Sequence, residues 1–292
     1  MQSSILTVVF LPVALGIIML GLGLSLTTED FRRVLLYPKA VVLGLACQML
    51  LLPAVCFGLA KAFALPPELA VGLMLLAASP GGATANLFSH LAHADVALNI
   101  TLTAVNSVLS LFTLPFIVNF ALVAFMGEGK TIPLQVDKVL QVFAIVLIPV
   151  SIGMLLHARS PHLAAKMNRP VRVMSALLLV LVIAATVLKE RANIVEFFRQ
   201  VGLAALAFNL VSLAVGYLAP RLLRLPKRQA VAIGMEIGIH NGTLAIAIAS
   251  SPLLLNNSTM AIPPAIYSLI MFFTATAFGW VVSRGKTDPA MA

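Results

Sequence analysis

Long apolar runs joined by short polar connections limit what this chain can fold into more than any other feature. Nine such runs can be drawn, at residues 5–26, 40–60, 68–90, 96–125, 139–157, 173–188, 201–219, 229–250 and 263–283. About 20 consecutive apolar residues are enough for a helix to cross the hydrocarbon core of a bilayer. The pattern therefore predicts an all-α polytopic membrane protein with about nine transmembrane helices. The connections are too short to hold a soluble domain, so we expect residues 1–292 to form a single transmembrane domain.

The composition agrees with a lipid bilayer as the surroundings of the chain. Hydrophobic residues make up 61% of it and charged residues only 10%, whereas a soluble domain carries about a quarter charged residues. The formal net charge of +9 would suit a nucleic-acid binder, but the basic residues lie in short clusters between the apolar runs, as topology signals do. We therefore expect no nucleic-acid partner. Nothing outside the runs suggests an obligate protein partner, and we predict a monomer.

The basic residues also predict the orientation of the chain in the membrane. Thirteen of the 19 Lys and Arg residues fall in every second connection, around residues 32–39, 159–172, 221–228 and 284–286. The other six are Lys61, Lys130, Lys138, Lys189, Arg191 and Arg199. Cytoplasmic loops carry the excess of positive charge, so the first set is predicted to be cytoplasmic. With nine spans, the N-terminus is then outside and the C-terminus inside, in what we expect to be the inner membrane of a bacterium.

Two of the runs contain features that interrupt a helix. The third holds SPGGATAN, where Pro80 removes a backbone hydrogen bond and Gly81 and Gly82 permit unusual backbone angles. The eighth is interrupted around Glu236 and Asn241 by regularly spaced glycines, namely Gly234, Gly238 and Gly242. Unwound backbone is tolerated at membrane depth only where protein or a wet cavity satisfies it. Two interrupted segments, one in each half of the chain, are typical of the binding site of a secondary transporter.

The two halves of the chain also echo each other weakly. The third run begins with LPPELAVGLM and the eighth with LPKRQAVAIGM. Four runs precede the connection at residues 126–138 and five follow it. We predict an inverted repeat that lacks one helix at its front.

Glu236 is a carboxylate in the middle of an apolar run. A charged group at the centre of a membrane helix costs about 2.5–3.5 kcal/mol on insertion scales. No Lys or Arg occurs inside the third, fourth or eighth run to pair with it. One interpretation is a protonated Glu that hydrogen-bonds a neighbouring helix. The pattern favours the other interpretation, in which Glu236 forms a cation or proton site.

Neutral oxygen-bearing side chains occur in the neighbouring runs. Asn86 ends the SPGGATAN stretch, and Asn99 and Thr103 are spaced i and i+4 on one helix face, whereas Thr101 and Asn106 are expected on other faces. Amide and hydroxyl oxygens with one carboxylate suit a monovalent cation such as Na⁺ better than Zn²⁺, which prefers Cys or His. Such residues also serve as ordinary contacts between membrane helices. Their combination with two interrupted helices favours a sodium site.

Three stretches resemble the bile acid:sodium symporter family. They are LGIIMLGLGLSLTTEDF, SPGGATANLFSHLAHADVALNITLT and GMEIGIHNGTLAIAIA, and the resemblance covers nearly the whole chain. It implies a panel domain beside a core domain in which two discontinuous helices cross. The panel would use part of residues 5–60 together with 139–188, and the core would use residues 40–125 and 201–283. Bacterial members often have ten helices, and this chain resembles the members that lack the first.

The resemblance also implies two sodium sites behind the helix crossing. The positions that match the first site are Ala85, Asn86, Asn99, Thr103 and Glu236. Those that match the second site are Gln48, Glu236, Ile237 and Ile239 through their backbone carbonyls, and His240.

This sequence departs from the family pattern at both sites. Ala85 stands where Ser is usual, Asn99 where a smaller Ser is common, and the Thr of the Gly-rich stretch is displaced to Thr84. The family's E-x-G-x-Q-N reads EIGIHN here, so His240 replaces a Gln carbonyl oxygen. Neutral imidazole is a poor ligand for Na⁺, and His titrates near physiological pH. The second site is therefore lost, weakened or converted to proton coupling, unless His240 only hydrogen-bonds a helix carbonyl and leaves sodium use unchanged.

Substrate is expected at the helix N-termini of the crossing, where unpaired N–H groups and the positive end of the helix dipole favour an anion. The candidate contacts are Gly81, Gly82, Ala83, Thr84 and Asn241. Family substrates are organic anions, which include bile acids and small carboxylates such as pantoate or keto acids. Met271 and Phe272 occupy places where some bile-acid-binding relatives carry His and Asn, which argues against a bile acid.

The sequence thus predicts a secondary active transporter that takes up an organic anion with Na⁺ by alternating access, and no enzymatic activity. The alternative is a proton-coupled or sodium-independent anion transporter with His240 as the switch. An intramembrane enzyme is a remote alternative, because Glu236 alone cannot serve as both acid and base of a two-carboxylate mechanism. A channel is another, and it would carry ion current without substrate.

Overall fold

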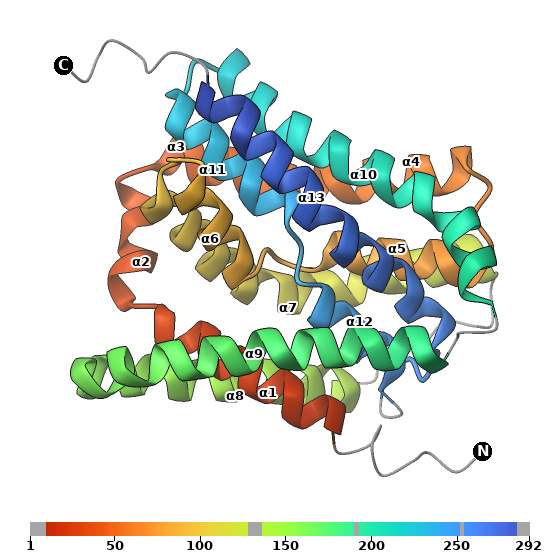
Figure 1. Ribbon diagram of the computed structural model, residues 1–292, viewed down its shortest axis with the longest axis horizontal. Helices are drawn as coiled ribbons and strands as arrows, with labels where there is room; N and C mark the ends of the chain where they lie inside the picture. The colour runs from red at the N-terminus through yellow and green to blue at the C-terminus, as the bar shows by residue number, and fades with distance from the viewer. Residues whose placement is uncertain (1–9, 128–135, 190–192, 252–253, 285–292) are drawn as a thin grey trace.

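The computed structural model describes residues 10–127, 136–189, 193–251 and 254–284, and these residues form helices and their connections without a β-strand (Figure 1). In chain order the elements are α1 (Leu11–Ser25), α2 (Thr28–Arg32), η2 (Arg33–Leu35), α3 (Pro38–Ala46), η3 (Cys47–Leu51), α4 (Leu52–Ala62), α5 (Pro67–Ala78), α6 (Ala83–Leu91), α7 (Val96–Met126), α8 (Val136–Arg159), α9 (Pro161–Lys189), α10 (Ile194–Leu222), α11 (Lys227–Gly238), α12 (Gly242–Ser250), η4 (Thr259–Ala261) and α13 (Ile262–Arg284). The prediction of an all-α polytopic membrane protein is confirmed.

Each predicted apolar run coincides with one helix, or with two or three helices in succession. The third run corresponds to α5 and α6, and the eighth to α11 and α12. By length and apolar composition, four helical segments of the described residues suffice to cross a membrane, and α1 with the segment after it makes a fifth that is bent by 71°. The count of nine spans stays a prediction. The start of the first run, before residue 10, and the charges of Lys130, Arg191 and Lys286 lie outside the described residues.

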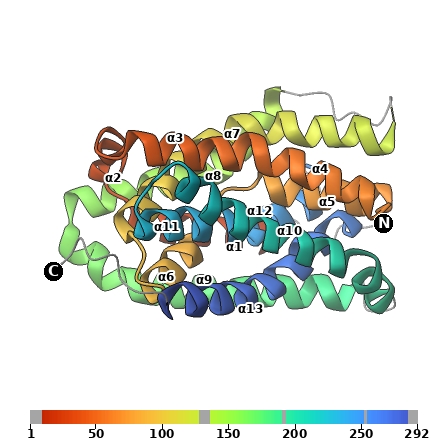
Figure 2. The same ribbon diagram turned by 90° about the horizontal axis from the view of Figure 1, so that it is seen from above.

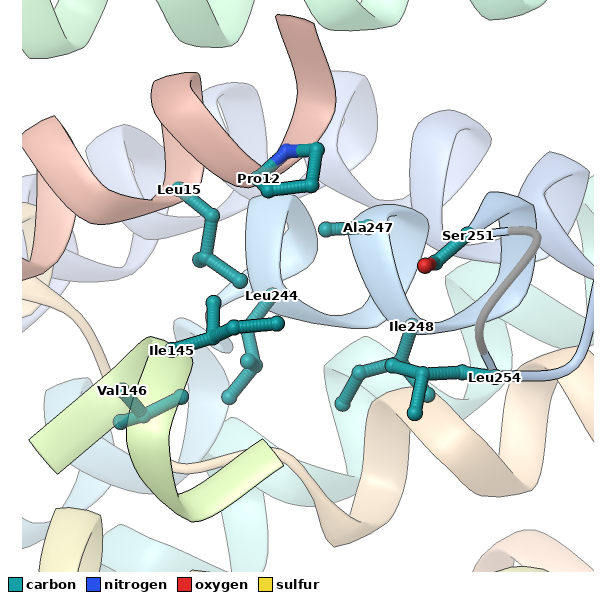
Figure 3. Close-up of a pocket in the computed structure, with 9 residues that line it drawn as sticks. All are labelled: Pro12, Leu15, Ile145, Val146, Leu244, Ala247, Ile248, Ser251 and Leu254. Atoms are coloured by element: carbon teal, nitrogen blue, oxygen red, sulfur yellow. The ribbon is translucent and has the colours of Figure 1, made fainter. Parts of the chain in front are cut away.

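The helices form two groups. α1, α8 and α9 pack against one another on one side of the molecule, and the remaining helices form the larger group (Figure 1). In the view from above, the larger group lies in front of these three helices (Figure 2). The two groups meet chiefly where α12 contacts α1 and α9, and where α13 contacts α9. Figure 3 shows a small apolar pocket at this boundary, lined by Pro12, Leu15, Ile145, Val146, Leu244, Ala247, Ile248, Ser251 and Leu254. The smaller group contains the segments expected in a panel, and the larger group those expected in a core.

Glycines let the backbones of α1 and α8 touch. A Cβ on Gly153 would stand 2.6 Å from the carbonyl oxygen of Leu20 and 2.6 Å from the amide nitrogen of Leu24. A Cβ on Gly23 would likewise stand 2.8 Å from the Cα of Val150. Small residues allow close approach of membrane helices, whose association depends on packing rather than on a hydrophobic driving force.

Gly153→Ala is therefore expected to destabilise the protein by about 1–3 kcal/mol, because the added methyl group meets backbone that cannot rotate away. The measurement is the melting temperature of the purified protein in detergent. Gly58→Ala is the matched control, since Gly58 is exposed on α4 and a Cβ there would meet nothing within 4 Å. A melting temperature that Gly153→Ala leaves unchanged would show that α1 and α8 are not packed this closely.

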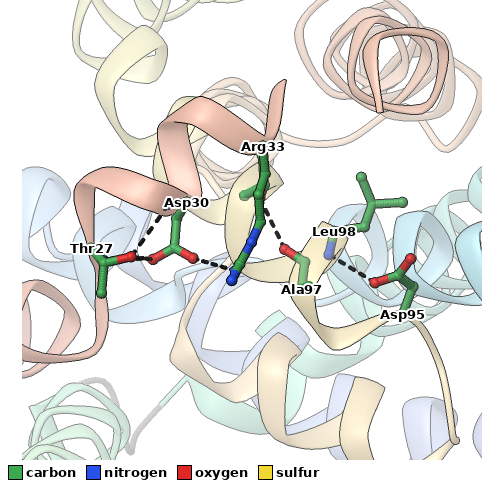
Figure 4. A network of polar contacts seen from close by, with 7 residues as sticks. Thr27, Asp30, Arg33, Asp95, Ala97 and Leu98 are labelled. Carbon is green, nitrogen blue, oxygen red and sulfur yellow. Dashed lines mark hydrogen bonds and ion pairs between the residues drawn. The ribbon is translucent and has the colours of Figure 1, made fainter. Parts of the chain in front are cut away.

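A short helical segment joins the two groups after α1. Thr27 caps α2 in a capping box with Asp30, whose carboxylate is buried and also accepts a hydrogen bond from Arg33 Nη1 at 2.7 Å (Figure 4). The segment packs on α7, whose first turn is capped by Asp95 through a 3.0 Å hydrogen bond from the Leu98 amide. These contacts attach α2 to the larger group and place the bend at the end of α1.

Two of the basic clusters, around residues 32–39 and 221–228, lie next to each other. Lys39 donates a 2.7 Å hydrogen bond to the carbonyl of Leu223, and Arg228 donates to the carbonyls of His93 and Ala94. The cations thus neutralise the negative ends of α10 and α6. The structure agrees with a common location for these loops, and their cytoplasmic side stays a prediction.

The sequence echo between the third and eighth runs corresponds to one repeated local structure. Ala64 and Arg224 both have positive φ, at 47° and 62°, directly before the two Leu-Pro pairs. The amide of Leu65 bonds the Ala60 carbonyl, five residues back, and Leu225 makes the equivalent bond. The helices that follow have equal lengths, 12 residues for α5 and α11 and 9 residues for α6 and α12. The inverted relation of the two halves stays a prediction.

Candidate functional site

The two interrupted helices meet at their breaks. Gly81, between α5 and α6, forms an isolated antiparallel bridge with His240, between α11 and α12. The Asn241 amide donates a 2.8 Å hydrogen bond to the carbonyl of Pro80. Each break therefore satisfies backbone groups of the other, which is how unwound backbone is tolerated inside a membrane protein. The crossing places two helix C-termini and two helix N-termini next to one another.

The break in the eighth run is shorter than the glycine spacing indicates. Only residues 239–241 are unwound, and Gly234 lies inside the continuous helix α11. Its role there is packing, since a Cβ on Gly216 of α10 would stand 2.7 Å from the Cα of Gly234. The expectation that Gly234 interrupts the helix is wrong for this physical reason. Glu236 accordingly projects from the last turn of a helix, and Asn86 lies in the first turn of α6 rather than in the break.

Glu236 is buried, with only 1% of its surface exposed. Its Oε2 accepts a 2.6 Å hydrogen bond from the hydroxyl of Thr103 on α7, and its Oε1 has no hydrogen-bond partner. The backbone of Gly81 lies against the same carboxylate, where a Cβ would stand 2.6 Å from Oε2 and closer still to Oε1. Among the described residues, no cationic side chain forms an ion pair with Glu236.

Two amide oxygens near Glu236 are also buried without a partner. Asn99 donates through Nδ2 to the carbonyl of Ala232 at 2.9 Å, which leaves its Oδ1 unsatisfied. The Oδ1 of Asn86 is unsatisfied as well. These residues and Glu236 come from α6, α7 and α11, which pack against one another. Buried polar atoms seldom lack partners, so a group of unpaired oxygens indicates a missing positive partner.

The donor set fits Na⁺. It offers a carboxylate oxygen, two amide oxygens and the Thr103 hydroxyl, which are hard ligands. Ala85 is fully buried and contributes a methyl group, so only its backbone carbonyl remains as a ligand. The described residues contain no group of three or more His, Cys, Asp or Glu that would hold a transition metal. Asp95 of the HLAHAD stretch caps α7 instead of joining a metal site.

Asn106 is a neighbour of Glu236 that the sequence interpretation assigned to another helix face. Its side chain lies close enough to interact with the carboxylate, and it is 1% exposed. Seven residues separate it from Asn99, and seven residues are almost two full turns of an α-helix. The earlier assignment is therefore wrong. The i, i+4, i+7 spacing of Asn99, Thr103 and Asn106 was the signal in the sequence that could have found it.

Gln48 and His240 also come together. Gln48, in the π-helical turn η3, donates through Nε2 to the carbonyls of Ser79 at 3.0 Å and Ala77 at 3.3 Å. His240 Nδ1 lies 3.1 Å from the same Ser79 carbonyl oxygen and 3.5 Å from Gln48 Nε2. The imidazole stacks on Phe208 at 5.6 Å, and its Nε2 has no partner.

At this second predicted sodium site, side chains of the protein already donate hydrogen bonds to two backbone carbonyls. Ser79 receives Gln48 and His240, and the carbonyl of Gly238 receives Asn209 and Tyr267, both at 2.9 Å. A cation bound to either of these two carbonyls would have to displace its donors. The side chains of the other two candidates for the second site, Ile237 and Ile239, are buried in the core.

The predicted substrate contacts divide between two sides of the crossing. Gly82 faces open space, since the atom nearest to a Cβ there would be the backbone nitrogen of Thr84, at 4.0 Å. Thr84 and Asn241 are half-buried at the starts of α6 and α12, and Asn241 Oδ1 accepts the Leu244 amide at 3.0 Å. Gly81 instead lies on the side of Glu236. Ala83 begins α6, and its side chain lies outside the described part.

The comparison with known families decides what kind of protein carries this site. The profile of the Sodium Bile acid symporter family matches residues 3–197. The chain belongs to this family. The resemblance inferred from the sequence is confirmed, and the sodium bile acid symporter family is one of sodium-dependent transporters rather than of enzymes.

Proteins from distant organisms are similar to the chain. The "Uncharacterized sodium-dependent transporter YocS" of Bacillus subtilis is 28% identical over 89% of this chain and 78% of the relative. The "Probable sodium/metabolite cotransporter BASS1, chloroplastic" of Arabidopsis thaliana is 29% identical over 88% of this chain, which spans 62% of that relative. The "Ileal sodium/bile acid cotransporter" of Oryctolagus cuniculus is 25% identical over 98% of this chain and 84% of the relative.

Proposed function

We propose that this protein takes up an organic anion together with Na⁺ by alternating access. The observation that carries the proposal is the buried Glu236 carboxylate, which has no cationic partner among the described residues and lies among unpaired oxygens. In the proposed site, Glu236 Oε1 and the Oδ1 atoms of Asn86 and Asn99 bind Na⁺, with Thr103 and the Ala85 carbonyl completing the set. Neutralisation by Na⁺ removes the penalty of a buried, unpaired charge.

The crossing also explains how Na⁺ and an anion would act on each other. The C-termini of α5 and α11 point to it with their negative dipole ends, and the N-termini of α6 and α12 with their positive ends. The proposed anion contacts are Gly82, Ala83, Thr84 and Asn241. Gly81, which was predicted as a substrate contact, lies beside Glu236 and is left out of this set. Because both ligands bind the same crossing, each stabilises the arrangement that the other needs.

Alternating access in this proposal is a movement of the larger helix group against α1, α8 and α9. A ligand drives such a change only if it binds one conformation more tightly than the other. Na⁺ meets this requirement if the oxygens from α6, α7 and α11 are brought together in only one of the conformations.

A single Na⁺ accounts best for the site. At the place around Gln48 and His240, protein donors bond the carbonyls of Ser79 and Gly238. Of the two side chains, only Gln48 offers an unpaired oxygen, because the imidazole supplies nitrogen. We therefore propose one sodium ion at Glu236 and none at the second place.

For the substrate we propose a small carboxylate. The rabbit relative is named for bile acid and the Arabidopsis relative for a metabolite. On α13, Met271 is 2% exposed and Phe272 packs on Phe88 at 6.1 Å between ring centroids. Neither side chain offers a hydrogen bond to the hydroxyl groups of a bile acid, whereas the helix N-termini suit a carboxylate.

Thermal unfolding in detergent tests the proposal. NaCl is expected to raise the melting temperature relative to KCl and choline chloride at equal ionic strength, because a ligand at 100 times its Kd adds about 2.7 kcal/mol of stability. Pantoate or pyruvate is then expected to add a further increase in NaCl only, and taurocholate to add none. Equal melting temperatures in the three chlorides would contradict sodium binding, and a pH-dependent shift without a sodium effect would favour proton coupling.

A further inference from the structure

Near the proposed sodium site, a buried hydrogen-bond donor on Asn106 and a buried acceptor on Glu236 both lack a partner. The Nδ2 of Asn106 has no hydrogen-bond partner, and neither has Oε1 of Glu236. The two side chains interact, yet no hydrogen bond of acceptable geometry joins them. Each is 1% exposed, so solvent does not satisfy either group.

The other polar side chains around Glu236 are committed elsewhere. The Thr103 hydroxyl already bonds Oε2, and Asn99 Nδ2 bonds the carbonyl of Ala232. Within the described residues, Asn106 is thus a side-chain amide donor available to the carboxylate, which the backbone amide of Gly81 also approaches. A small rotation of the amide would form a hydrogen bond to a charged oxygen, which is stronger than one between neutral groups.

Na⁺ and the Asn106 amide are competitors for the same oxygen. A cation at Oε1 would place its charge next to the amide hydrogens, which carry partial positive charge. The amide must then turn away, or present its own oxygen. Of these two groups, only one at a time can therefore lie against Oε1, the ion or the Asn106 amide.

We propose that Asn106 is a positioning residue that holds Glu236 when no cation is bound and competes with Na⁺ for Oε1. The inference rests on the proposed sodium site. Its consequence is that the cation-free carrier is stabilised, so that the site can empty and return without leaving a buried carboxylate oxygen unpaired.

A sodium titration of the melting temperature tests this role with Asn106→Leu, which keeps the branched shape of the side chain and removes the amide. The variant is expected to melt at a lower temperature than the wild type in choline chloride. Its half-maximal sodium concentration is expected to fall about tenfold, as for the loss of one competing hydrogen bond to a charged group. A side chain needed only for packing would lower the melting temperature in both salts and leave the half-maximal concentration unchanged.

Thr101→Val is the matched control. Thr101 is also buried on α7, and its hydroxyl bonds the carbonyl of Ala97 in its own helix at 2.9 Å. Its half-maximal sodium concentration is expected to equal that of the wild type. If Asn106→Leu does not fold, Asn106→Ala also removes the donor and is expected to shift the concentration in the same direction.

An unchanged or higher half-maximal sodium concentration in the Asn106 variants overturns the inference while the sodium site stands. A higher one would make the Asn106 oxygen a sodium ligand. If the wild type itself shows no sodium effect, the proposed site fails and the inference fails with it, so the two failures are distinguishable.

Discussion

Glu236→Gln is expected to abolish both sodium-dependent stabilisation and sodium-driven uptake. The amide that replaces the carboxylate has the same shape but no charge, and the remaining ligands of the proposed site are neutral. The loss corresponds to about 2.7 kcal/mol at a sodium concentration of 100 times Kd. Melting temperatures in NaCl and in choline chloride are the measurement, with uptake by proteoliposomes under a sodium gradient as the second readout.

The same variant is expected to melt in choline chloride at or above the temperature of the wild type, because an unpaired buried charge has been removed. Glu196→Gln is the control, since Glu196 is exposed on α10 and accepts a hydrogen bond from Gln200 at 2.8 Å. It should retain the full sodium effect. A sodium effect that survives Glu236→Gln would place the cation elsewhere in the molecule.

Gly81→Ala is the second change with a large expected effect. Its methyl group would overlap the buried Glu236 carboxylate, which accepts a hydrogen bond from Thr103. We expect the carboxylate to be displaced and the apparent affinity for Na⁺ to fall at least tenfold. The loss of one hydrogen bond to a charged group produces about this change. The folded protein should persist, because the contact is with the end of a side chain rather than with backbone.

Gly82→Ala is the matched control for this experiment. Gly82 is the next residue, and a Cβ there has no neighbour closer than 4.0 Å. Sodium titrations of the two variants separate a need for space beside Glu236 from a need for flexible backbone at the break. If both variants lose the sodium effect equally, backbone freedom explains it. If neither does, the carboxylate is not confined as the structure indicates.

The breaks in the third and eighth runs were predictable because their causes are local. Pro80 cannot donate a backbone hydrogen bond, and any chain with Pro-Gly-Gly at this point is interrupted there. The eighth break was placed less well, since Gly234 belongs to a continuous helix. The sequence alone does not distinguish a glycine that permits close helix packing from a glycine that permits unwinding of the helix.

The membership of the cation site was predictable only in part. Glu236, Asn86, Asn99 and Thr103 stood out as polar residues in apolar runs, and whether they bind Na⁺ stays a prediction. Asn106 has the same character and was assigned to the wrong face. Its spacing of seven residues from Asn99 indicates the same face of the helix, but the spacing alone does not say which other helix packs on that face.

The sequence by itself determined that this chain is a polytopic membrane protein with two interrupted helices and a carboxylate that an apolar run cannot hold without a partner. These conclusions follow from the transfer of apolar and charged groups to lipid and from the backbone restrictions of proline, which act on each segment separately. The tertiary structure alone decided that Thr103 meets Glu236 across 133 residues, and that Gly81 rather than Gly82 lies against the carboxylate. Such contacts depend on how α7 and α11 pack, and packing is the sum of many small interactions along both helices instead of a property of either residue.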